Sequence, residues 1–366
     1  MRILVLAQTP PPMHGQSFMV RMAVDGLARR GFRVHHVPLQ LSRSHGDIGR
    51  WRPGKVLAAV RAGLAAARVA RAEPFDALYY VPAPGRRGAL WRDIVVLGLA
   101  RRSVPRLVLH WHASGLGTWL GGSATGAERA AAQRTLGGAD LSIVLAEALR
   151  ADAQALRARR IAVVPNGVPD PSPPPRQPPP AGRPWQVLFL GQCSEEKGVF
   201  AAAEAVALLN RGEQAGAYHL VAAGPFPGSR EADRFALLAR RYPGEIRHAG
   251  EVSGEEKRRL FLESDCLCLP SRYPHEGQPL VLLEALAYDL PVVATRWRAI
   301  PETLSPGTGE LVDTGEPGPV AAALRAVRER PPTPGLARQC YLDRFTDERH
   351  LDRLAAALRQ LKERAE

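Results

Sequence analysis

Two carboxylates, Glu276 and Glu284, stand eight residues apart and bracket a turn in the chain. An apolar run at residues 266–270 precedes them and predicts a strand, and a second apolar run from Leu280 predicts a helix. Glu276 would then lie ahead of the helix and Glu284 one turn inside it. Open parallel sheets bind ligands at the carboxyl ends of their strands, where such turns lie.

The first turn of this helix offers a place for an anion, because the amides at a helix start have no partner within the helix. A diphosphate would meet the backbone N–H groups of Gly277, Gln278, Leu280 and Val281, while the two carboxylates would accept hydrogen bonds from sugar and ribose hydroxyls. The pattern therefore suits a nucleotide sugar. The spacing leaves open the alternative of a buried helix with two incidental glutamates, one of them a solvated cap.

The full stretch from Pro270 to Thr295 resembles the signature of the retaining GT-B glycosyltransferases of family 4, the sucrose synthase and mannosyltransferase type. The resemblance implies an α/β fold with two Rossmann-like, doubly wound parallel-sheet domains that face each other across a cleft. It also implies transfer of a hexose or N-acetylhexosamine from a nucleoside diphosphate sugar to a hydroxyl acceptor. Glu276 would position the sugar, and Glu284 would hold the ribose.

A second match is the sequence Gly-Gln-Cys-Ser-Glu-Glu-Lys-Gly, where the family has Gly-Arg followed, five residues after the arginine, by Lys-Gly. In the family the arginine and the lysine clamp the donor pyrophosphate. Lys197 fits, but Gln192 stands at the arginine position, which removes a fixed charge and a bidentate fork. Either Lys197 and helix amides carry the phosphate, or Arg272 or Arg296 reaches into the site.

Residues 13–17, Met-His-Gly-Gln-Ser, follow the first predicted strand and open a helix. A glycine at this place lets a phosphate or sugar approach the backbone closely. By the resemblance, Gly15 would face the donor phosphate, and His14 and Gln16 would lie on the acceptor side. Gly15 is otherwise a turn glycine.

His110 and His112 end a strand predicted at residues 107–111, and alternate residues of a strand point to the same face. A metal pair is conceivable, but the sequence shows no third ligand and no Asp-x-Asp motif, so we expect neither a metal nor another cofactor. The resemblance makes His112 the sugar-facing histidine and leaves His110 to the core. Together with His112, it places Glu276 and Lys197 at the reacting centre.

Three shorter matches complete the site that the resemblance implies. Asn166 and Gly167 belong to a Pro-Asn-Gly-Val turn that ends the first domain and is expected to shape the cleft floor. Val252 lies in the loop whose backbone would read the nucleobase. Glu302 either caps its own helix or touches ligand.

Apolar runs alternate with helical stretches along the chain of 366 residues, of which 45% are hydrophobic and 23% charged. Such alternation predicts doubly wound parallel sheets. Nine of the sixteen residues at 169–184 are proline, which indicates a stiff extended linker. We therefore predict an acceptor-binding domain at 1–168, a nucleotide-sugar-binding domain at 185–345, and a C-terminal helix at 346–366 that crosses back to the first domain.

The sequence shows no secretory signal, and no uncharged apolar run approaches the length of a membrane span. The four cysteines form neither a disulfide framework nor a zinc motif. These features predict a cytoplasmic protein with reduced thiols.

The net charge of +13 is uneven, because residues 1–166 hold 24 Lys and Arg against 9 Asp and Glu. Two stretches, residues 50–71 and 86–102, carry much of this charge together with Trp51 and Trp91. A basic amphipathic helix with tryptophan suits the headgroup layer of an anionic membrane. We therefore predict peripheral association with the inner face of the plasma membrane and a glycan or lipid-linked acceptor. A solvated basic face of an enzyme with a small acceptor is the alternative. The arginines lie among Ala and Leu rather than among exposed aromatics, which argues against nucleic acid as a partner.

Two other functions remain open. Because of Gln192, the chain could be a weakly active partner subunit that binds a nucleotide sugar, and the purified chain would then not turn over donor. It could also be a nucleotide-sugar epimerase of the same architecture, which would change free donor without an acceptor. The sequence identifies neither the sugar, the base nor the acceptor.

Overall fold

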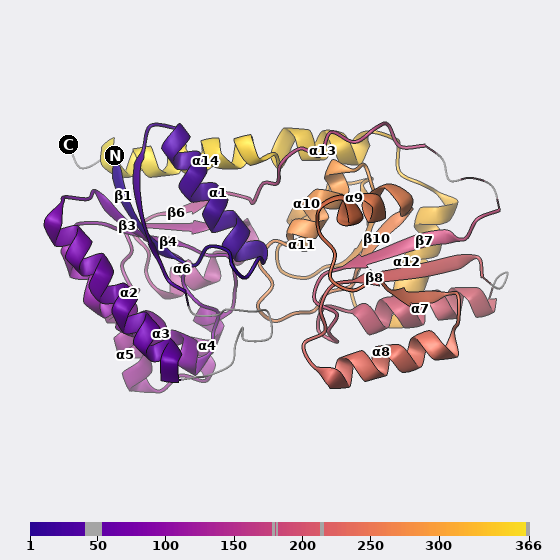
Figure 1. Cartoon of the computed structure of the whole chain (residues 1–366), viewed down its shortest axis with the longest axis horizontal. Helices are drawn as coiled ribbons and strands as arrows, with labels where there is room; N and C mark the ends of the chain where they lie inside the picture. The colour runs from indigo at the N-terminus through magenta and orange to yellow at the C-terminus, as the bar shows by residue number, and fades with distance from the viewer. Residues whose placement is uncertain (41–52, 178–179, 181, 213–215, 364–366) are drawn as a thin grey trace. The chain divides into compact units, whose positions relative to one another are not determined.

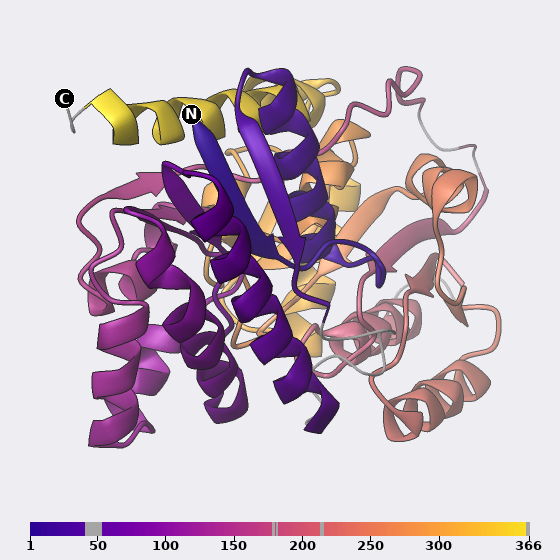
Figure 2. The same cartoon turned by 60° about the vertical axis from the view of Figure 1, so that its left-hand side comes forward.

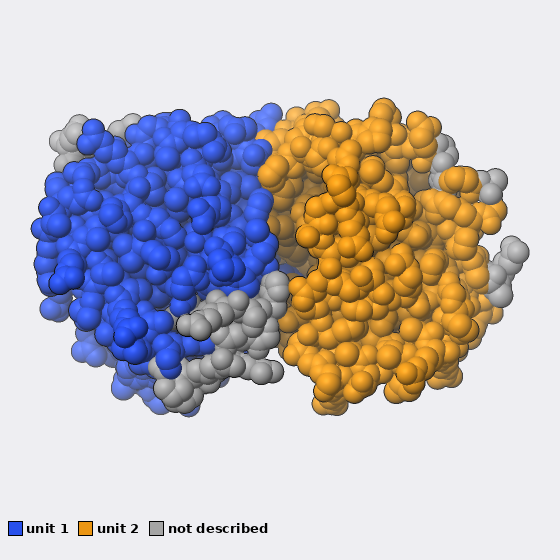
Figure 3. Space-filling model, viewed as in Figure 1, with its two compact units in different colours: residues 1–167, 275–278, 347–366 blue, residues 168–274, 279–346 orange. Residues whose placement is uncertain are grey.

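A computed structural model describes residues 1–40, 53–177, 180, 182–212 and 216–363 of the chain (Figure 1). The chain forms two compact units, which Figure 3 shows in different colours. Unit 1 comprises residues 1–167, 275–278 and 347–366, and unit 2 comprises residues 168–274 and 279–346. Four residues in the middle of the second half, His275–Gln278, thus belong to the first unit.

Unit 1 is built on a six-stranded parallel sheet in the order β2-β1-β3-β4-β5-β6. Strands β3, β4 and β5 are buried along their whole length, as their apolar sequences predict. The strands are β1 (Arg2–Ala7), β2 (Arg33–Pro38), β3 (Ala77–Tyr80), β4 (Leu107–His110), β5 (Leu141–Val144) and β6 (Ile161–Val163). The helices are α1 (Gly15–Arg29), α2 (Pro53–Ala72), α3 (Arg87–Ala100), η2 (Arg101–Ser103), α4 (Leu116–Gly122), α5 (Gly126–Thr135), η3 (Glu147–Leu149), α6 (Ala151–Ala155) and α14 (Asp347–Glu363).

The C-terminal helix α14 completes the core of unit 1 from the far end of the sequence. It packs beside α1, as Figures 1 and 2 show, and its Leu354 and Leu358 join the same buried cluster as Val20 of α1. At the contact, a Cβ on Gly26 would lie 2.4 Å from the side chain of Leu351, so only glycine lets the two helices approach this closely.

Unit 2 has a second six-stranded parallel sheet, in the order β12-β11-β10-β7-β8-β9. Its strands are β7 (Trp185–Leu190), β8 (Tyr218–Ala223), β9 (Ile246–His248), β10 (Cys266–Leu269), β11 (Val292–Thr295) and β12 (Gly309–Val312). Its helices are α7 (Val199–Gly212), α8 (Ser229–Arg241), α9 (Gly254–Glu263), α10 (Leu280–Ala287), α11 (Ile300–Thr303), α12 (Pro317–Glu329) and α13 (Leu336–Arg344).

Each sheet has one point where the strand order reverses. In unit 1 this point lies between β1 and β3, and in unit 2 it lies between β7 and β10. Ligands of open α/β sheets bind at such points, outside the carboxyl ends of the strands. The loop after β1 and the turns after β7 and β10 are therefore placed where a site is expected.

The two doubly wound parallel sheets confirm the predicted fold class. The proline-rich segment, predicted as an extended linker at 169–184, belongs to unit 2 and is tied down within it. Asp170 pairs with Arg338 of α13 at 2.6 Å, and Arg176 donates to the carbonyl oxygen of Ser264. Within the described ranges, no helix is both long enough and apolar enough to span a bilayer.

Candidate functional site

Unit 1 places three histidines together at the carboxyl end of β4. His110 and His112 have ring centroids 4.2 Å apart, and His350 of α14 stacks on His110 at 6.2 Å. The hydroxyl of Tyr79 and Nδ1 of His110 form a hydrogen bond, and Nδ1 of His350 donates to the carbonyl oxygen of Pro165 at 2.7 Å. Two imidazoles of this cluster are therefore fixed in orientation by partners in the core.

Burial keeps all three imidazoles neutral. It lowers the pKa of His112 to about 3 and that of His350 to about 4, and it holds the pKa of His110 well below its ordinary value. Neighbouring imidazoles lower the pKa values of His110 and His112 further, since two positive rings so close would repel. Nε2 of His112 has no hydrogen-bond partner among the described atoms. A neutral His112 can thus exchange one hydrogen bond with a ligand hydroxyl.

The loop after β1 presents His14, Gly15 and Gln16 at the start of α1. His14 is the N-cap of this helix, and its Nδ1 accepts a hydrogen bond from the amide of Ser17 at 3.3 Å. His14 also lies near enough to His112 to contribute to the lowering of its pKa. The structure therefore brings His14, predicted on the acceptor side, near the predicted sugar-facing histidine His112, and it gives His14 a capping role as well.

Hydrogen bonds to Ser114 and Asn166 hold the segment His275–Gln278 in unit 1. The amide of Ser114 donates to the carbonyl of His275 at 3.4 Å, and the hydroxyl of Ser114 donates to the carbonyl of Glu276 at 2.8 Å. The amide of Asn166 donates to Oε1 of Gln278 at 2.7 Å, and its side-chain nitrogen donates to the carbonyl of Gln278 at 3.2 Å. Asn166, predicted to shape the cleft floor, thus fixes Gln278, whose backbone N–H group was predicted to meet the donor diphosphate.

The close approach of two backbone segments requires a glycine at position 277. A Cβ at this position would lie 2.3 Å from the carbonyl oxygen of His112, which is backbone and cannot move aside cheaply. The neighbouring Glu276 is only 5% exposed. The predicted carboxylate Glu276 is therefore placed next to the predicted histidine His112 by backbone contact.

In unit 2, the turn after β7 presents Lys197. Gly198 has φ +86°, and a Cβ there would lie 2.5 Å from the carbonyl oxygen of Pro270, so this turn is pressed against the end of β10. The ammonium of Lys197 lies 4.9 Å from the ring centroid of Tyr273, a cation–π contact that gives the flexible side chain a preferred position. The sequence did not predict a role for Tyr273, although it is the aromatic residue of the Ser-Arg-Tyr-Pro run.

Gln192, which stands where the family has an arginine, is exposed on the surface of the same turn. The two arginines considered as substitutes already have partners. Arg272 donates to the carbonyl oxygen of Asp313 at 3.2 Å and stacks over Trp297, and Arg296 pairs with the Asp313 carboxylate at 3.2 Å. Of these two, Arg272 is nearer to the lysine turn, since its amide donates to the carbonyl of Glu196 at 2.7 Å.

Glu284 lines a pocket of about 240 Å³ in unit 2, between α9, α10 and residues 168–171. Lys257 of α9 donates to its carboxylate at 2.6 Å. Leu280 and Val281 lie in the first turn of α10, the helix that carries Glu284. Their amides have no acceptor within the helix. Val252 lies in the loop that joins β9 to α9, ahead of Lys257. Lys257 was also missed, because nothing in the spacing of α9 relates it to Glu284.

The predicted residues thus form two groups, each within one unit. Unit 1 holds His14, Gly15, Gln16, His112, Glu276, Gly277 and Gln278, and unit 2 holds Gln192, Lys197, Val252, Leu280, Val281 and Glu284. Glu302 lies in the short helix α11. Among the described residues, no group of His, Cys, Asp or Glu is arranged to hold a metal ion.

Comparison with known proteins gives this arrangement a family context. Residues 175–340 match the family model of the glycosyl transferases group 1. The amylovoran biosynthesis glycosyltransferase AmsK of Erwinia amylovora is 30% identical over 151 residues, which cover 39% of this chain and 35% of that protein. The chain spans little more than a third of the length of the curated relatives that it matches.

Solved structures match over nearly the whole chain. A sucrose-phosphate synthase of Thermosynechococcus elongatus has a TM-score of 0.77 at 18% identity and covers 100% of both chains. The Anabaena protein HepE, solved in complex with UDP-glucose, has a TM-score of 0.72 at 17% identity and covers 98% of this chain and 100% of its own. The fold is therefore that of the GT-B glycosyltransferases, with two Rossmann-like parallel-sheet units.

Proposed function

We propose that this protein is a retaining glycosyltransferase that moves a hexose or N-acetylhexosamine from a nucleoside diphosphate sugar to a hydroxyl acceptor. The observation that carries the proposal is the match of residues 175–340 to the glycosyl transferases group 1, because this range contains Lys197, Glu276 and Glu284. Lys197 and Glu276 lie in the turns that follow β7 and β10, where the strand order of the second sheet reverses, and Glu284 lies in α10, the helix after the second turn.

Unit 2 would bind the nucleotide of the donor. Lys197 and the amides of Leu280 and Val281 would meet the diphosphate, and their positive charge would stabilise the nucleoside diphosphate as it leaves. Glu284 would accept hydrogen bonds from the ribose at the mouth of its pocket, and the backbone near Val252 would contact the base. Because a lysine and helix amides supply the positive charge, the proposed reaction needs no metal ion.

Unit 1 would bind the sugar and the acceptor. A neutral His112 would form a hydrogen bond with a sugar hydroxyl through Nε2, and Glu276 would position the sugar. His14 and Gln16 would lie on the acceptor side, and Gly15 would let the donor phosphate approach the start of α1. In this proposal the leaving phosphate helps to deprotonate the acceptor on the same face of the sugar, so no side chain acts as a nucleophile.

The proposed classes of donor and acceptor are based on two similar proteins. HepE was solved with UDP-glucose, which supports a nucleoside diphosphate hexose as donor. AmsK is named for amylovoran biosynthesis, which supports a growing or lipid-linked glycan as acceptor.

A panel of UDP, GDP and ADP tests the donor site by thermal shift. A ligand at about 100 times its Kd stabilises the folded state by about 2.7 kcal/mol, which is readily measured. Radiolabelled sugar transfer from the matching donor, with EDTA present, then tests turnover. Lys197→Ala should abolish transfer, whereas Arg240→Ala, an exposed cation of α8, should not. Full transfer by Lys197→Ala would refute the assignment of the phosphate site.

One observation favours a second function, a nucleotide-sugar-binding subunit of low activity. Gln192 is exposed at the position where the family has an arginine, and Arg272 and Arg296 are engaged elsewhere. Binding of a nucleoside diphosphate without transfer or hydrolysis would support this function. Interconversion of free donor in the absence of acceptor would instead indicate an epimerase.

A further inference from the structure

The outward face of α2 alternates leucine and arginine. Leu57, Arg61, Leu64, Arg68 and Arg71 are all exposed and follow one another at intervals of four, three, four and three residues. This spacing places them in one stripe along the helix. Leu57 is 51% and Leu64 53% exposed, which is high for large apolar side chains in the middle of a helix.

The neighbouring helix α3 carries an exposed tryptophan near the start of α2. Helices α2 and α3 pack side by side, as Figures 1 and 2 show, and Gly63 of α2 lies against Val96 and Leu99 of α3. Both helices connect parallel strands, so they run in the same direction, and the contact at Gly63 sets Trp91 beside the first turns of α2. Trp91 is 46% exposed there.

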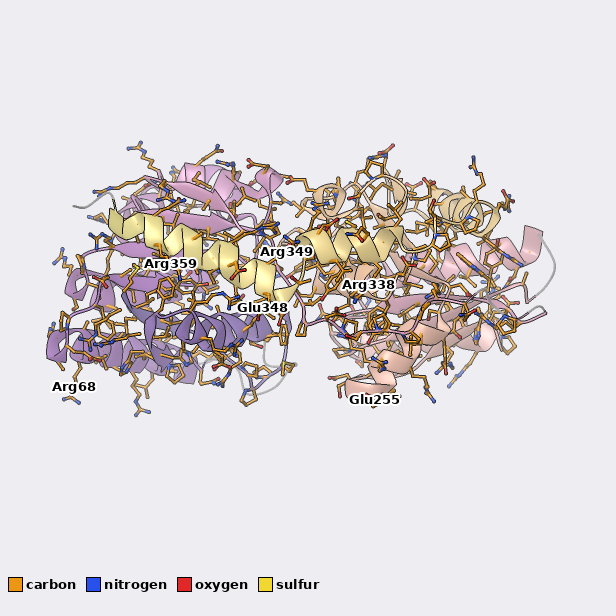
Figure 4. All side chains as sticks on the ribbon, turned by 90° about the horizontal axis from the view of Figure 1, so that it is seen from above. Arg68, Glu255, Arg338, Glu348, Arg349 and Arg359 are labelled. Atoms are coloured by element: carbon orange, nitrogen blue, oxygen red, sulfur yellow. The ribbon has the colours of Figure 1, made fainter. Side chains whose placement is uncertain are left out.

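The charge of this surface has one sign. Helix α2 contains no Asp or Glu, and Asp93 of α3 is fully buried. Within the described part of the chain, Arg61, Arg68 and Arg71 take part in no ion pair or side-chain hydrogen bond. Figure 4 shows the side chain of Arg68 directed away from the ribbon into solvent. We call these residues the Leu–Arg face, which comprises Leu57, Arg61, Leu64, Arg68, Arg71 and Trp91.

Some cations that the sequence placed in this surface have other partners. Arg87 pairs with Glu128 at 2.8 Å, and Arg92 pairs with the buried Asp93 at 2.6 Å. Arg101 donates to the carbonyl oxygen of Thr135 at 2.7 Å. The second basic stretch therefore contributes less than its composition predicts. Trp51, with its flanking arginines, lies outside the described residues.

We propose that the Leu–Arg face docks unit 1 on an anionic lipid bilayer. Arginine guanidinium groups bind lipid phosphates, while the intervening leucines and Trp91 enter the apolar side of the headgroup layer. A protein partner would favour an apolar centre with few charges, and a nucleic acid would leave the leucines against phosphate. The alternation of both residue types along one stripe matches a surface in which phosphates and acyl chains lie side by side.

This docking goes beyond the proposed function, because it requires neither donor nor catalysis. Co-sedimentation of the full chain with vesicles tests it, using phosphatidylcholine alone and phosphatidylcholine mixed with phosphatidylglycerol, at low and high salt. We expect binding to the mixed vesicles at low salt, weak binding to the neutral ones, and loss of binding at high salt. Equal binding to both vesicle types, or none to either at low salt, would overturn the proposal.

Matched variants locate the surface. Each cation near an anionic membrane contributes about fivefold to the partition coefficient, so Arg61→Gln with Arg68→Gln should weaken binding about 25-fold. Arg230→Gln with Arg240→Gln, two exposed positions of α8 in unit 2, should leave it unchanged. Loss of equal size in this control pair, or equally tight binding to duplex DNA at the same phosphate concentration, would refute the assignment.

A separate variant tests the leucines of the Leu–Arg face. Leu57→Ser with Leu64→Ser should weaken binding at low salt while keeping the dependence on anionic lipid. Unchanged binding by this variant would refute the insertion of the stripe. All variants should retain the thermal shift with nucleoside diphosphate, so a failure of docking is separable from a failure of the donor site.

Discussion

Acidification should destabilise unit 1 through its three buried histidines. In the unfolded chain a histidine has a pKa of about 6.5. In the folded unit, burial lowers the pKa of His112 to about 3 and that of His350 to about 4, and it holds the pKa of His110 well below its ordinary value. Because the folded pKa values are depressed, the unfolded state binds more protons below pH 6.5. The stability is therefore complete above that pH and is lost as the pH falls.

The size of the effect follows from proton linkage. Each histidine that is protonated only in the unfolded state lowers the free energy of unfolding by about 1.4 kcal/mol per pH unit. For His350, a change from pH 7 to pH 5 should remove about 2 kcal/mol, and His112 and His350 together should remove about 4 kcal/mol. A domain has a total stability of about 5 to 15 kcal/mol, so this loss is a large share.

Hydrogen exchange of peptides from α14 and β4 reports the opening of unit 1 itself, once the pH dependence of the intrinsic exchange rate is removed. His350→Gln keeps a donor for the carbonyl of Pro165 but cannot titrate. We expect it to reduce the pH slope of protection by about 1.4 kcal/mol per unit. His219→Gln, in β8 of unit 2, should leave the slope of unit 1 unchanged. An unaltered slope in His350→Gln would refute the linkage.

Three further substitutions test the site and its support. Gly277→Ala should lower kcat/KM for transfer at least about tenfold and also lower Tm, since the new Cβ would lie 2.3 Å from the backbone carbonyl of His112 and displace Glu276; unchanged kinetics would contradict this. Asp93→Asn should cost about 3 kcal/mol in urea unfolding, because this buried carboxylate pairs with an arginine and accepts from a tyrosine hydroxyl and an amide; a loss below about 1 kcal/mol would speak against its buried role. Glu284→Ala should weaken nucleoside diphosphate binding by about 1 to 3 kcal/mol in calorimetry, and unchanged affinity would remove Glu284 from the donor site.

The sequence was sufficient for the sheets, because a buried parallel strand needs a continuous apolar run. Strands β4, β5 and β10 are such runs, and each is buried along its whole length. The turns that carry the candidate site residues could also be predicted, because parallel strands direct their carboxyl ends to the same edge of the sheet. What remained out of reach are contacts between residues far apart in the chain.

His350 and Lys257 illustrate this limit. His350 sits in a helix of ordinary amphipathic pattern, and only the packing of α14 on unit 1 brings it to His110. Lys257 lies among other charged residues of α9, so its pairing with Glu284 depends on how two helices meet. Charge patterns mislead for the same reason: Arg92 and Arg101 count toward a basic surface in the sequence, yet they satisfy a buried carboxylate and a helix end.

The docking of α14 on α1 has a consequence for synthesis of the chain. Domains generally form in the order in which they leave the ribosome, the N-terminal one first. Here, Leu354 and Leu358 are part of the buried cluster of unit 1, together with Val20 of α1. The apolar side of α1 therefore stays uncovered while all of unit 2 is translated. The unit that contains the first strand is therefore completed only after its last helix, α14, has been made.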